Sequence, residues 1–304
     1  MKTSTLVASL VAAAGLVNAI PAPQPVVTLT VVPIAATSSP YPDKPVTNEI
    51  QYANYDEKSD TDKATRTKVH NAFVPWAAMM QKGIESVANS DDKTFDRWFP
   101  PTVKVKGGSI DARGYVSGVY RQLLQPDPTT PKPKATVATI VNDKDDYAKT
   151  CKTNTYAYFT RDIGRFHVCD KGLKQPTAAT DIKCQDLGTQ VSSKMESLTS
   201  TIVHEFMHWD KTGDTAPNSV GHITDVIYGA GSCSRLRDGG DKQKTFINAD
   251  SYMWMAVNAY YNSICGKSFG DPYITSEDFE ESDATLLESP EYDVNVSSGV
   301  LAGV

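Results

Sequence analysis

The sequence predicts an α+β fold that is mainly helical and contains a small β-sheet. Several segments repeat apolar residues at the spacing of an α-helix, and two shorter runs alternate apolar and polar residues as half-buried strands do. The helical pattern covers residues 62–89, 193–209 and 250–264, and the alternating pattern covers residues 135–141 and 156–168. Helices are therefore expected to form the larger part of the core.

The first helical segment, residues 62–89, carries an apolar stripe and contains Pro75. A proline inside a helix removes a backbone hydrogen bond, so Pro75 either kinks this helix or marks its true start. Residues 92–125 follow as a helix, a turn and a second helix, and residues 126–134, with four prolines, form a loop. The stripe consists of Val69, Phe73, Ala77, Met80 and Ile84.

The best-defined helix is expected over residues 193–209. Ser193, with Glu196 three residues later, has the pattern of a capping box, which satisfies free backbone N–H groups at a helix start. Gly213 is available as a C-terminal cap. A later helix over residues 250–264 starts at a capping Asn or Asp, and Asp250 is either that cap or a residue of the functional pocket.

Composition divides the chain into four parts. Residues 1–19 have the positive start, short apolar run and small final residues of a secretory signal peptide. Residues 20–58, rich in Pro and Thr, predict an extended leader or short pro-segment, and residues 270–304, with nine acidic and no basic residues, predict a disordered tail. Residues 59–269 remain as the folded domain, which we expect to be a secreted, extracellular monomer.

Five cysteines are typical of a protein exported to an oxidising compartment, where four should pair and one should remain. Their pairing can be drawn in fifteen ways, and the sequence does not decide among them. The net charge of −6 comes from the acidic tail, and the rest of the mature chain is close to neutral. This balance indicates no nucleic-acid partner and no membrane-binding surface.

The motif His204-Glu205-Phe206-Met207-His208 predicts a zinc site. Two histidines four residues apart lie on one face of a helix, so both rings can reach one Zn²⁺ ion. Glu205 points to the neighbouring face, where it can hold the metal-bound water. Zinc lowers the pKa of that water, and Glu205 can take its proton during attack on a peptide carbonyl.

A catalytic zinc needs a third protein ligand. No glutamate occurs between Glu205 and Glu277, which excludes a site completed by a glutamate soon after the motif. Asp214 lies six residues after His208, but Lys211 stands where a glycine would ease the reversal of the chain. The residues by themselves leave Asp214, His222 and Asp225 as candidates.

The stretch from Thr224 to Gly229 resembles the Asp-x-x-Tyr-Gly signature of the aspzincins, the deuterolysin-like zinc metalloendopeptidases. The resemblance implies that Asp225 is the third zinc ligand and that Tyr228 stabilises the oxyanion formed during peptide hydrolysis. It also implies a zincin-like metallopeptidase domain over residues 59–269, one Zn²⁺ per chain and a polypeptide substrate. Shorter similarities lie at residues 95–99, 164–170 and 248–252.

The chain also differs from the family pattern. His222 and Ile223 replace the usual Gly-Thr pair, and the segment 209–223 is longer than usual. Met253 stands where the lysine-specific branch has an acidic residue, so we do not expect lysine specificity. The alternative is a secreted zinc-binding or zinc-scavenging protein on the same fold. Glu205 favours the enzyme, because a pure binder has no need of a base there.

Overall fold

The computed structural model describes residues 27–30, 47–105, 108–124, 138–142, 150–151, 154–216 and 219–273. The expected signal peptide, the loop at 126–134 and the tail expected over residues 270–304, apart from residues 270–273, lie outside these ranges. The described residues form helices and a small β-sheet, so the predicted α+β class is confirmed. Among the residues that the structure describes, no helix is long and apolar enough to cross a membrane.

The main sheet has the strand order β1-β2-β5-β7-β6. Strands β2, β5 and β7 are parallel to one another, and β1 and β6 run antiparallel to their neighbours, which places β6 at one edge. A separate hairpin pairs β3 with β4. The strands are β1 (Val27–Thr30), β2 (Thr47–Ala53), β3 (Thr102–Val105), β4 (Gly108–Asp111), β5 (Thr139–Asn142), β6 (Ala157–Thr160) and β7 (Arg165–Val168).

Residues 47–53, which composition assigned to the leader, form β2 in the middle of this sheet. The side chains of Ile50 and Tyr52 are buried in the core. The prolines that dominate the average composition of residues 20–58 all lie before Asn48, and the alternating apolar residues that build the strand come after them. The packed part of the chain therefore begins before residue 59.

Eight α-helices occur in the described ranges. The break expected at Pro75 is present, because Pro75 occupies the N-cap position of α2. The helix α8 is buried on all sides over residues 249–261 and packs against α2, α3 and α6. The helices are α1 (Asp60–Phe73), α2 (Trp76–Ala88), α3 (Thr94–Trp98), α4 (Ala112–Leu124), α5 (Asp170–Leu173), α6 (Leu198–Met207), α7 (Ala230–Asp238) and α8 (Ala249–Cys265).

The helix with the histidine motif is shorter than predicted. Residues 193–195 form one turn of 3₁₀-helix, and α6 begins after Ser197. The N–H of Ser200 donates to Ser197 Oγ at 3.1 Å and the N–H of Ser197 donates to Ser200 Oγ at 2.8 Å, so the capping box uses a second serine in place of a glutamate. At the other end, the Thr212 hydroxyl donates to the Phe206 carbonyl, which satisfies a free acceptor of the last turn.

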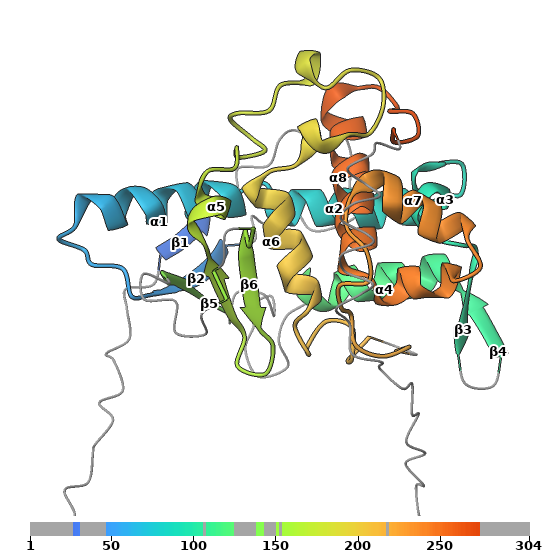
Figure 1. Cartoon of the computed structure of the whole chain (residues 1–304), viewed down its shortest axis with the longest axis horizontal. Helices are drawn as coiled ribbons and strands as arrows, with labels where there is room; N and C mark the ends of the chain where they lie inside the picture. Colours follow the sequence, from blue (N-terminus) through green and yellow to red (C-terminus); the bar gives the residue numbers. More distant parts are fainter. Residues whose placement is uncertain are drawn as a thin grey trace, which may run out of the picture.

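Two disulfides hold the described part together, as the cysteine count predicted. Cys151–Cys169 joins the chain before β6 to the chain after β7, and Cys184–Cys265 fixes the end of α8. Cys233, outside both disulfides, is buried in α7. Figure 1 shows α6 between the β6 edge of the sheet and α8, both of which it contacts.

Candidate metal centre

The two histidines of the motif meet at the C-terminal end of α6. His204 lies in the last turn, and His208 is the C-cap residue. Their Nε2 atoms are 3.3 Å apart. Phe206, between them in sequence, points to the core, where it contacts Phe73, Phe159 and Phe166. Packing of one helix face against the sheet and α1 therefore turns both imidazoles to the opposite side.

Asp225 is the carboxylate that the fold brings to these rings. Its Oδ1 atom lies 3.0 Å from His204 Nε2 and 3.2 Å from His208 Nε2. This oxygen is buried and has no hydrogen-bond partner among the described residues. A buried acceptor without a donor is rare in proteins and needs another explanation.

The spacing of these three atoms suits a tetrahedral metal ion. Zinc bonds of about 2.0–2.1 Å place tetrahedral ligand atoms about 3.3 Å apart. The three separations here are 3.0, 3.2 and 3.3 Å. Two imidazole nitrogens and one carboxylate oxygen are a donor set that zinc accepts, and three protein ligands leave a fourth position open. The residues therefore fit a catalytic type of zinc site.

The far side of each imidazole ring is held by an acceptor. The Nδ1 atom of His204 lies 2.6 Å from Asp250 Oδ1, and the Nδ1 atom of His208 lies 3.0 Å from the carbonyl oxygen of Ile223. Such contacts orient ligand histidines and leave Nε2 free to face a metal. Asp250 thus contacts the candidate metal centre through His204, and it forms no side-chain cap on α8.

The start of α8 also holds the loop that carries Asp225. Asn248 Oδ1 accepts hydrogen bonds from the backbone N–H groups of Val226 (3.0 Å) and Ile227 (3.1 Å). The second oxygen of Asp250 accepts from the N–H of Gly229 at 2.8 Å. Gly229 has φ +84°, a conformation that favours glycine. These bonds fix the loop directly after Asp225 and on both sides of Tyr228.

Burial and neighbouring charges shift the pKa values of all three candidate ligands. Burial opposes a charge on His204 and on His208. The Asp225 carboxylate, together with Asp250 at His204, outweighs burial and raises the pKa of both rings. Burial likewise opposes ionisation of Asp225, yet the two imidazoles hold the pKa of its carboxyl well below the usual value. The centre attracts positive charge, which protons or a cation can supply.

Glu205 and Tyr228 flank this cluster. Glu205 is 8 % exposed, and burial raises the pKa of its carboxyl, which suits a group that must accept and release a proton. Burial, and then the Asp225 carboxylate, raise the pKa of Tyr228, so its phenol keeps its proton. The Tyr228 ring stacks on His204, with ring centroids 5.9 Å apart.

The structure does not bring the other two candidate ligands to the motif. Asp214 and His222 gather with Asp210 in a second group of potential metal ligands. Asp225 reaches the first group after a turn at Gly221, where φ is +124°. The sequence had given Asp250 as either a helix cap or a residue of the functional pocket and had shown Asn248 only as part of a short similarity. It did not indicate that the Ile223 carbonyl would hold His208.

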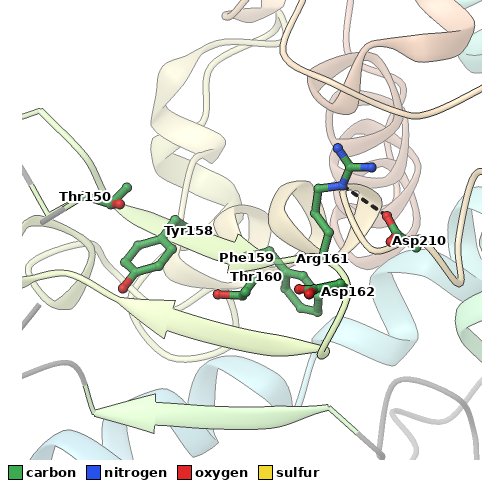
Figure 2. Close-up of a pocket in the computed structure, with 7 residues that line it drawn as sticks. All are labelled: Thr150, Tyr158, Phe159, Thr160, Arg161, Asp162 and Asp210. Atoms are coloured by element: carbon green, nitrogen blue, oxygen red, sulfur yellow. Dashed lines mark hydrogen bonds and ion pairs between the residues drawn. The ribbon is translucent and has the colours of Figure 1, made fainter. Parts of the chain in front are cut away.

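A hollow of about 460 Å³ lies beside β6 (Figure 2). It runs along the edge strand to Asp210, two residues after His208, and an ion pair between Arg161 and Asp210 crosses one end. None of the five predicted site residues lines it. The lining residues are Thr150, Tyr158, Phe159, Thr160, Arg161, Asp162 and Asp210.

No protein-family model matches the chain, and no curated protein matches it. Among solved structures, the chain is similar to a zinc peptidase from Grifola frondosa, with 18 % sequence identity and a TM-score of 0.40. The similarity covers 66 % of this chain and 96 % of that peptidase.

Proposed function

We propose that this protein is a secreted zinc-dependent metalloendopeptidase, with His204, His208 and Asp225 as zinc ligands. The observation that carries the proposal is the Asp225 Oδ1 atom, which is buried without a hydrogen-bond partner in the described residues and lies 3.0 and 3.2 Å from two imidazole nitrogens. A cation between these three atoms satisfies all of them. The Asp-x-x-Tyr-Gly resemblance to the aspzincins supports the same ligand set.

In this proposal, each residue around the ligands has a separate role in peptide hydrolysis. Bound zinc supplies Lewis acidity to the reacting water and carbonyl. Glu205 accepts the proton of the attacking water and delivers it to the leaving amine, for which its raised pKa is suited. Tyr228, which keeps its hydroxyl proton, donates a hydrogen bond to the oxyanion that develops on the carbonyl. Asp250 holds His204 in orientation throughout.

The substrate proposed for this centre is an extended polypeptide. The edge strand β6 packs against α6, which carries the histidines. The free backbone groups of an edge strand can pair with a peptide laid alongside it. This arrangement binds the backbone of the substrate and favours cleavage of internal bonds. Export to an oxidising compartment agrees with the two disulfides.

Proteolysis of casein by the purified full-length secreted chain tests the proposal. We expect activity that a chelator removes and added Zn²⁺ restores. The Glu205→Gln variant should bind zinc as the wild type does but lose hydrolysis, because Glu205 is not a ligand. Zinc binding with no hydrolysis by the wild type would instead identify a zinc-scavenging protein on the same fold.

A further inference from the structure

The segment between α6 and Asp225 contains a second convergence of metal-binding side chains. Asp210 and Asp214 come from its first half, and His222 comes from its end. One ligand atom of each lies within 4.8 Å of the other two. His222 Nδ1 is 3.4 Å from Asp214 Oδ1 and 3.9 Å from Asp210 Oδ1. Asp214 and His222, which follow Asp210 by four and twelve positions, thus lie close to it in the folded chain.

We propose that Asp210, Asp214 and His222 form a second zinc site, separate from the centre on α6. Tetrahedral zinc spaces its ligands about 3.3 Å apart, so the Asp214–His222 pair has the required separation already. Asp210 needs a shift of well under an ångström relative to His222. All three side chains are partly exposed, between 21 and 40 %, which leaves them room for this adjustment.

The donor set selects the class of ion. An imidazole nitrogen with two carboxylate oxygens suits zinc and similar transition ions, whereas calcium and magnesium prefer oxygen ligands alone. His222 presents its Nδ1 atom to both carboxylates, and a neutral imidazole can bind a metal through that nitrogen.

Arg161 sets the strength of this second site relative to the first. Its Nε atom lies 3.0 Å from Asp210 Oδ1, the pair that Figure 2 shows at the end of the hollow. The guanidinium cancels part of the charge of the two carboxylates, so a dication is held less strongly than without it. We expect the second site to fill at a higher free Zn²⁺ concentration than the centre on α6.

The second site is connected to the first through the backbone. His222 directly precedes Ile223, whose carbonyl oxygen lies 3.0 Å from His208 Nδ1. Asp210 is two residues after His208. An ion bound by Asp210, Asp214 and His222 would link the segment that directly follows His208 to the residue next to Ile223, whose carbonyl contacts the His208 ring. The second zinc therefore stabilises the segment 209–223, which carries no disulfide.

The number of bound zinc ions tests this proposal. The purified full-length chain is stripped with a chelator, dialysed against graded free Zn²⁺ and analysed for zinc by mass spectrometry. We expect Asp214→Asn and His222→Gln each to bind one ion fewer than the wild type. The matched control Asp162→Asn, which changes a carboxylate in the adjoining hollow outside the cluster, should bind as many as the wild type.

The thermal unfolding midpoint is the second measurement. Zinc beyond the first ion should raise the midpoint of the wild type and of Asp162→Asn but not that of His222→Gln or Asp214→Asn. Equal zinc content in the wild type and both cluster variants would overturn the second site. The His208→Gln variant separates the two proposals: it should lose the tighter ion and keep the weaker one. Full retention of zinc by His208→Gln would refute the centre on α6 and leave the second site standing.

Discussion

Replacing Asp250 with Asn tests how the start of α8 organises the metal centre. The Asp250 carboxylate lies 2.6 Å from His204 Nδ1 through one oxygen and accepts from the Gly229 N–H at 2.8 Å through the other. Asparagine has the same shape but only one acceptor oxygen. One of the two N–H groups must then face the amide NH₂, and the negative charge beside the imidazole is lost.

The magnitude follows from these two contacts. Loss of the carboxylate partner of a metal-bound histidine weakens metal binding by about 10–100-fold. This range corresponds to about 1.4–2.7 kcal/mol of binding free energy. Asp250→Asn should lie in the upper half of the range, because it disturbs the His204 ring and also the loop at Gly229 that follows Asp225 and Tyr228.

Competition with a chromogenic chelator measures the zinc affinity of the variant. Asp241→Asn serves as control, because Asp241 is an exposed carboxylate that pairs with Lys244 away from the centre. Circular dichroism of the metal-free proteins should show the same helical content for both. A zinc affinity of Asp250→Asn within about twofold of the wild type would refute the role assigned to Asp250, since it lies far below the range expected for such a contact.

Three further outcomes are expected. Glu205→Gln should retain zinc and lose at least about a hundredfold in the hydrolysis rate, or about 3 kcal/mol of transition-state stabilisation; an unchanged rate would contradict the peptidase mechanism. At free Zn²⁺ too low to fill the second site, Asp225→Ala should lose the metal and Asp214→Ala should keep one ion per chain, and the reverse pattern would make Asp214 the third ligand. Because Asp225 raises the pKa of His204 and His208 above their ordinary value of 6.5, protons compete with zinc around neutral pH. The apparent zinc affinity should therefore rise with pH above 6.5, and the stability that these charged pairs give the metal-free chain should fall as pH passes the raised values; an affinity independent of pH in equilibrium dialysis would contradict this reasoning.

Local patterns in the sequence predicted several elements well. Pro75 separates α1 from α2, because a proline cannot continue a helix at that point. The alternation in residues 156–168 became the antiparallel pair β6 and β7. The four-residue spacing of His204 and His208 was enough to predict that their rings would meet, since that spacing brings side chains together on any helix.

Other predictions failed where two local patterns competed or where distant segments decided. Ser193 with Glu196 and Ser197 with Ser200 both fit a helix start, and the second pair forms the cap of α6. The proline-rich average of residues 20–58 concealed β2, whose place in the sheet depends on pairing with β5 almost ninety residues later in the chain. Short-range composition contains no information about that partner.

The sequence by itself predicted a metal motif on a helix, the helical periodicity and two disulfides, because these features depend only on residue types and near spacing. Residue spacing left the third ligand open among Asp214, His222 and Asp225, and only the family resemblance pointed to Asp225. The tertiary structure places the Asp225 carboxylate beside the histidines. Asp214 and Asp225 both follow α6, and only the folded loop, held by Asn248 and Asp250, turns Asp225 to the rings and Asp214 to His222. It likewise decided which cysteines pair. These contacts join residues that are far apart in the sequence. Which distant residues come together is not specified by the spacing of neighbouring residues.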